Sequence, residues 1–189
     1  MRTLIIMAAF FSSLGKLFGD DKPSYEVAEI YTDMREQVLK LNEKEMPRLK
    51  GKPVWAVLME TGFPEAAYTL VAAADGAASL YFSNGGGIVG AGEHEKVRPA
   101  SLKMVKMAED YLKHMKKVDK FPVVQPGKTT FYVVTPKGIF AYSAETDDLG
   151  EERDKKLSPL FYQGHELIRK IRMAEEKRQA EQDGKRQGE

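Results

Sequence analysis

The chain of 189 residues is long enough for one domain with a hydrophobic core and too short for a clear division into two. Its formal net charge of +1 creates no overall field that would draw it to nucleic acid, and we find no strong nucleic-acid signal. It contains no cysteine, which excludes disulfides, thiol catalysis and thiolate zinc sites and fits a reducing cytoplasm.

Residues 1–19 form an apolar, amphipathic N-terminal segment. Its apolar side chains recur three and four residues apart, at Phe10, Phe11, Leu14, Leu17 and Phe18. Such a helix would dock on the domain, contact a partner or lie on a membrane surface. The run 4–11 is much shorter than the roughly 20 apolar residues of a membrane span. A cleaved signal peptide and a start at Met7 remain open alternatives.

The next part of the chain predicts one helix and three strands. Apolar residues at the helical period predict a helix from about residue 24 to 46, with Arg35 on its charged outer face. The period then changes, and apolar runs predict strands at 54–61, 66–74 and 77–84. Asp75-Gly76 between the last two is a strong hairpin signal.

The second half of the chain repeats this alternation. A lysine-rich helix is predicted to begin near Pro99, and the runs 129–134 and 139–145 predict a β-hairpin. A last helix is predicted to begin near Leu157. Beyond residue 173 the chain is almost wholly charged or amide-bearing, so we expect 174–189 to be a disordered tail.

These elements predict a single α+β domain over residues 20–173. We expect a five-stranded, mainly antiparallel sheet, built from a three-stranded meander and a hairpin, with helices packed on it. The order α-β3-α-β2-α resembles the profilin-like group of folds, which includes the longin and roadblock domains. This resemblance covers most of residues 24–173 and rests on element order alone. Longin and roadblock domains act mainly as interaction and scaffolding modules, often as dimers.

The glycine-rich stretch 83–95 is the best candidate for a ligand site. Gly85, Gly87 and Gly90 match the letters G-x-G-x-x-G, but the next helix is predicted about eight residues too late for its amides to hold a pyrophosphate. Phosphate binding by a backbone nest and a purely structural strand end both remain open. The candidate ligand-binding residues are Ser83, Asn84, Gly85, Gly86, Gly87 and His94.

We identify no catalytic constellation in the sequence. His94, His114 and His165 carry no metal-binding spacing, and there is no G-x-S-x-G motif. We therefore expect no catalytic residue, no metal and no cofactor. The sequence favours a non-enzymatic, cytoplasmic interaction or regulatory module that forms homodimers or binds a protein partner. The alternatives are a ligand-binding protein or enzyme with its site at 83–95, and a peripheral membrane protein held by residues 4–18.

Overall fold

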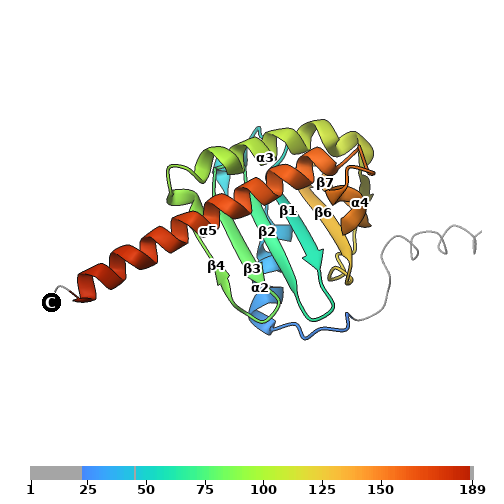
Figure 1. Ribbon diagram of the computed structural model, residues 1–189. Helices are drawn as coiled ribbons and strands as arrows, with labels where there is room; N and C mark the ends of the chain where they lie inside the picture. The colour runs from blue at the N-terminus through green and yellow to red at the C-terminus, as the bar shows by residue number, and fades with distance from the viewer. Residues whose placement is uncertain (1–22, 45, 188–189) are drawn as a thin grey trace, which may run out of the picture.

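A computed structural model describes residues 23–44 and 46–187 and shows an α+β fold built on one antiparallel sheet (Figure 1). The strands are β1 (Ala56–Gly62), β2 (Ala67–Ala73), β3 (Ala78–Phe82), β4 (Gly87–Ile88), β5 (Lys116–Val118), β6 (Lys128–Thr135) and β7 (Gly138–Glu145). The α-helices are α2 (Glu29–Leu39), α3 (Arg98–Tyr111), α4 (Thr146–Gly150) and α5 (Ser158–Gln187). Short 3-10 helices are η1 (Pro47–Leu49), η2 (Ala91–Glu93) and η3 (Leu112–His114).

The α+β class and the antiparallel sheet are confirmed, whereas the predicted count of five strands is wrong. The described residues form seven strands in the order β4-β3-β2-β1-β6-β7-β5, with every neighbouring pair antiparallel. The two additional strands, β4 and β5, lie at the edges and contain two and three residues. Segments this short carry no periodic pattern, so only their pairing with β3 and β7 defines them.

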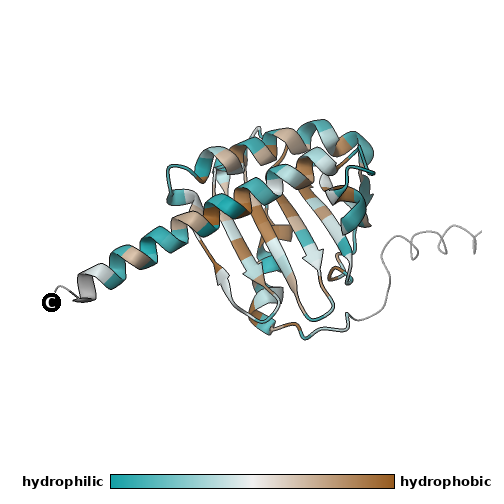
Figure 2. Cartoon of the chain, viewed as in Figure 1, coloured by the Kyte–Doolittle hydropathy of each residue, from teal (hydrophilic) through white to brown (hydrophobic). Residues whose placement is uncertain are grey.

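Helices cover both faces of the sheet. Helices α3 and α5 pack on one face and α2 on the other, so the hydrophobic strand residues are sandwiched (Figures 1 and 2). The central strand β1 is buried along its whole length. This explains why its sequence reads as a nearly continuous apolar run rather than an alternating one. Gly164 brings α5 close to the sheet, because a β-carbon there would lie 2.6 Å from Met59 Sδ.

The first described helix is shorter than predicted and is turned about its axis. Helix α2 begins at Glu29; the chain before it bends at residues 24–25, where Ser24 Oγ donates to Pro64 O at 3.1 Å, and Ala28 is extended. Arg35, predicted on the outer face, is instead 4% exposed, whereas Ile30 is 52% exposed. The prediction for Arg35 is therefore wrong, because hydropathy alone cannot anticipate a buried partner for a cation.

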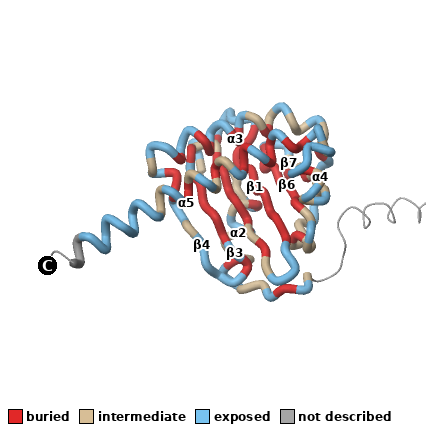
Figure 3. The backbone as a smooth tube through the Cα atoms, in the orientation of Figure 1, coloured by how far each residue is buried: buried red, intermediate tan, exposed pale blue. Residues whose placement is uncertain are grey.

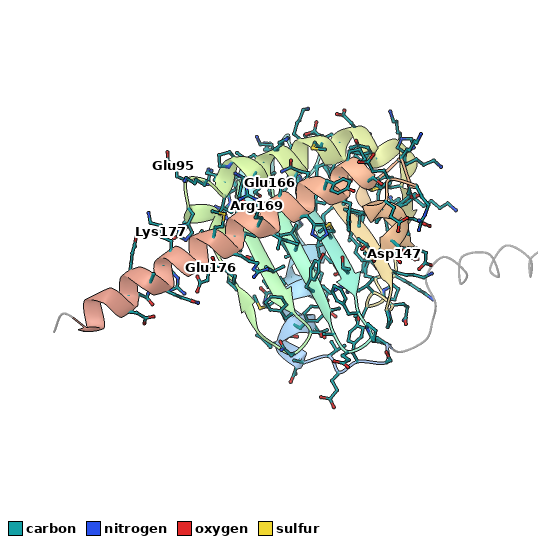
Figure 4. The ribbon with its side chains drawn as sticks, viewed as in Figure 1. Glu95, Asp147, Glu166, Arg169, Glu176 and Lys177 are labelled. Carbon is teal, nitrogen blue, oxygen red and sulfur yellow. The ribbon has the colours of Figure 1, made fainter. Side chains whose placement is uncertain are left out.

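Helix α5 extends well beyond the sheet. Its far part is exposed and carries charged side chains, including Glu176 and Lys177 (Figures 3 and 4). Ion pairs between successive turns, such as Glu175 with Arg178 and Lys177 with Glu181, lie along it. The helix thus occupies most of the segment 174–189, whose disorder remains a prediction.

Candidate functional site

Ser83 and Asn84, at the end of β3, serve the local backbone. Ser83 is 1% exposed, and its hydroxyl accepts a hydrogen bond from the Ala67 amide at 3.0 Å. Its own amide donates to Ala67 O, and its carbonyl accepts from the Ala28 amide, both at 2.8 Å. Asn84 Oδ1 accepts from the Gly86 amide at 3.0 Å, closing a turn of the kind that asparagine favours. The oxygen atoms of both side chains therefore accept hydrogen bonds from nearby backbone amides.

The first two glycines form the tight turn between β3 and β4, and the third begins β4. Gly85 has φ +91°, a region that residues with a side chain rarely adopt, and its amide donates to Phe82 O at 2.9 Å. Gly86 donates to Asn84 and accepts from the Phe82 amide, and Gly87 pairs with Tyr81 in the sheet. A phosphate nest needs converging amides without partners. The amides of Gly85 and Gly86 are already engaged, which favours the structural interpretation of this turn.

The second part of the stretch packs against the β2–β3 turn. A β-carbon on Gly92 would lie 2.3 Å from Gly76 O, so η2 can approach this closely only because residue 92 has no side chain. The carbonyl of His94 then accepts from the amides of Val97 and Arg98, at 3.0 and 3.2 Å. His94 therefore leads into α3, which begins at Arg98, far beyond the glycines.

The imidazole of His94 borders a cleft of about 490 Å³ between residues 88–94 and α5. The cleft is lined by Ile88, Val89, Gly90, Ala91, Glu93, His94, Ile171, Glu175 and Arg178. Arg178 donates to both carboxylate oxygens of Glu175, at 2.6 and 2.8 Å. This hydrogen bonding lowers the pKa of Glu175 to about 2, with smaller contributions from Gln179 and His94. The one arginine of the lining is thus paired with Glu175, and Glu93 adds a second carboxylate, which disfavours an anionic ligand.

The predicted ligand-binding residues do not converge on one place. Ser83 and Asn84 line a broad groove of about 1050 Å³ with residues 23–28 and the β1–β2 turn. His94 belongs to the separate cleft beside α5. Among the described residues, no group of three or more histidines and carboxylates is placed to hold a metal ion. The partner or membrane candidates Phe10, Phe11, Leu14, Leu17 and Phe18 lie outside the described residues.

A buried polar network that the sequence analysis missed lies under α2. Arg35 Nε and Nη2 donate to the two oxygens of Glu60, at 2.5 and 3.0 Å, and Glu60 is fully buried on β1. Arg35 also donates to the carbonyls of Phe121 and Pro122, at 2.9 and 3.0 Å. The sequence offered one signal of this network, which is Glu60, a lone acidic residue within an apolar strand. Because Arg35 makes four hydrogen bonds and both side chains are almost wholly buried, this pair is suited to holding the fold together rather than to catalysis.

Tyrosines complete this network. The hydroxyl of Tyr31 shares a hydrogen bond of 2.8 Å with Thr69 Oγ1, and Thr69 donates to Glu60 Oε1 at 3.2 Å. Tyr132 donates to Pro122 O at 3.0 Å, and its ring lies 5.3 Å from the guanidinium carbon of Arg35. Tyr25 donates to Val124 O. Burial, reinforced by Glu60, raises the pKa of Tyr25, Tyr31 and Tyr132, so all three phenols stay neutral.

Three aromatic side chains form a partly exposed row on the α5 side of the sheet, beyond the point where α5 crosses it. Tyr68 and Phe82 are cross-strand partners, and the rings of Phe63 and Tyr68 lie 6.0 Å apart. Phe63 is 48% and Phe82 38% exposed. Figure 1 shows the strands continuing past α5 on this face. We call Phe63, Tyr68 and Phe82 the aromatic row.

The chain was compared with models of protein families, with curated proteins and with solved structures, and none of them matches it. Within residues 23–44 and 46–187, no helix has the length and apolar character needed to cross a bilayer.

Proposed function

We propose that the protein is a non-enzymatic interaction or regulatory module of the cytoplasm that associates with itself. The observation that carries this proposal is the contrast between the two edges of the sheet. The β5 edge presents Lys116 and Lys117, both exposed, and charged lysines on an edge strand disfavour pairing with another chain. The β4 edge presents Gly87 and Ile88 followed by Val89, which is 65% exposed, with no charge among them.

The backbone geometry of β4 agrees with pairing to a second copy. Gly86 accepts a hydrogen bond from Phe82, and Ile88 stands opposite Leu80 in the antiparallel ladder. The intervening Gly87 therefore directs its amide and carbonyl away from β3, toward the open edge. Two copies that pair antiparallel through this edge would be related by a twofold axis, and each Val89 would be covered. The order of the longer elements, which resembles that of longin and roadblock domains, supports such a role.

Light scattering of Val89→Asp beside the native chain tests this proposal. We expect the native protein to scatter as a dimer and Val89→Asp as a monomer, because each copy would place a carboxylate in the shared edge. Leu102→Asp is the matched control, since Leu102 is 40% exposed and belongs to helix α3 rather than to the sheet. Both variants should keep the native circular dichroism. A monomeric native protein, or a variant Val89→Asp that remains dimeric, would refute self-association through β4.

A further inference from the structure

The aromatic row is an apolar surface that no described element covers. It continues the core beneath α3 and α5, against which Tyr68 packs, but Phe63 and Phe82 remain about half and one third open to solvent. The hydroxyl oxygen of Tyr68 is buried without a hydrogen bond of ordinary geometry to the described residues, although Thr61 lies close enough to affect its pKa. Contiguous exposed aromatic surface of this kind marks a place where another group packs.

The described chain begins beside this row. Ser24 is fixed to Pro64 O, and Pro64 follows Phe63 directly in the β1–β2 turn. Only residues 19–23 separate Ser24 from the apolar segment 4–18, and five extended residues span at most about 18 Å. The sequence of residues 4–18 is LIIMAAFFSSLGKLF, which contains a single charge, at Lys16. An apolar segment is therefore tethered within reach of the uncovered apolar surface.

We infer that residues 4–18 cover the aromatic row of their own chain. Short flexible tethers give local concentrations on the order of millimolar, which favours the chain's own segment over one from a second copy in dilute solution. Packing on the row would remove the exposed parts of Phe63 and Phe82 from water, which is favourable because the buried surface is apolar. The β4 edge plays no part in this contact, so the inference does not depend on the proposed self-association.

Thiol labelling tests this inference, and the absence of native cysteine makes the readout specific. A cysteine is introduced at Phe82→Cys on the row, or at Leu102→Cys on α3, where the native side chain is 40% exposed compared with 38% at Phe82. Each is made in the full chain with a native segment and in the full chain carrying Phe10→Asp, Phe11→Asp and Phe18→Asp. We expect the charged segment to speed labelling at position 82 by about tenfold or more and to leave position 102 unchanged.

Because Phe82→Cys removes one aromatic ring of the row, labelling is also measured at a second position. Phe63→Cys leaves Phe82 in place and should show the same acceleration. Protection within one chain is independent of protein concentration, whereas protection by a second copy falls on dilution. Equal labelling with native and charged segments at both positions would overturn the inference. So would protection that disappears on dilution, or protection that arises only after lipid vesicles are added, which would assign the segment to a second copy or to a membrane.

Discussion

Arg35 on α2 and Glu60 on β1 neutralise each other in a part of the molecule that water does not reach. Their side chains are 5% and 0% exposed, and the guanidinium meets the carboxylate through two hydrogen bonds. The two remaining bonds of Arg35 go to the carbonyls of Phe121 and Pro122, in the segment between β5 and β6. One side chain thus joins the helical layer, the central strand and a long connection.

The first prediction concerns the cost of breaking this pair. Arg35→Met should lower the free energy of unfolding by about 3–5 kcal/mol, because it leaves a carboxylate buried without a cation. Arg35→Met combined with Glu60→Leu should be more stable than Arg35→Met alone, since the uncompensated charge is then absent. Urea unfolding of the native chain, both single variants and the double variant measures the coupling free energy. Additive effects of the two single substitutions would show that the pair is not coupled.

A second prediction concerns alkaline pH. The raised pKa of Tyr31 comes mainly from burial, with Glu60 acting in the same direction. Below about pH 10, the ordinary pKa of a tyrosine, the phenol is protonated in both folded and unfolded chains and stability is fully present. Above that value only the unfolded chain releases the proton. Stability therefore falls by about 1.4 kcal/mol per pH unit for each such tyrosine until the pH reaches the folded pKa.

Tyr31→Phe should reduce this alkaline slope by about one proton, or 1.4 kcal/mol per pH unit. At neutral pH it should lower the free energy of unfolding by about 1 kcal/mol, because the hydrogen bond to Thr69 is lost. Urea unfolding between pH 8 and 11 measures the slope. Thr69→Val is the control, because it removes the hydrogen-bond partner of Tyr31 and keeps the phenol. It should lower stability at every pH and leave the slope unchanged. If Tyr31→Phe kept the same slope of stability against pH as the native chain, the phenol of Tyr31 would ionise equally in the folded and unfolded states.

The central strands could be predicted because their signals are local. β1, β2, β6 and β7 are runs of apolar, β-branched and aromatic residues, and Asp75-Gly76 marks a hairpin without reference to the rest of the chain. The edge strands β4 and β5 could not be predicted, because a segment of two or three residues becomes a strand only through its neighbour. Strand pairing depends on residues that are distant in sequence, so a short stretch of sequence cannot predict it.

The buried face of α2 was predicted wrongly for a related reason. Tyr31, Arg35 and Leu39 are spaced four residues apart and are the buried residues of the helix. The apolar pattern placed Arg35 on the outer face, whereas Arg35 is buried and Ile30 is exposed. The partner that permits burial, Glu60, lies 25 positions away. Sequence proximity was also a poor guide to the candidate site, since Ser83 and His94 are close in sequence but line separate clefts.

The last prediction separates two structural uses of glycine within the stretch 83–95. Gly90 has φ +72° and open space where a β-carbon would lie, whereas a β-carbon on Gly92 would collide with the backbone of Gly76 and Ala77. Gly90→Asn should therefore be nearly neutral, because asparagine tolerates the left-handed region, and Gly90→Ala should cost about 1 kcal/mol. Gly92→Ala should lower the free energy of unfolding by about 1–3 kcal/mol, and Gly92→Asn should lower it more, because each added atom forces η2 further from the sheet.

Thermal and urea unfolding of these four variants measure the pattern. The order of the asparagine and alanine variants is the decisive observation, since it should reverse between the two positions. If asparagine were as well tolerated at 92 as at 90, the close approach of η2 to the β2–β3 turn would not limit that position. The reversed order would instead show that Gly92 is required by packing, and that part of the glycine-rich pattern needs no ligand to explain it.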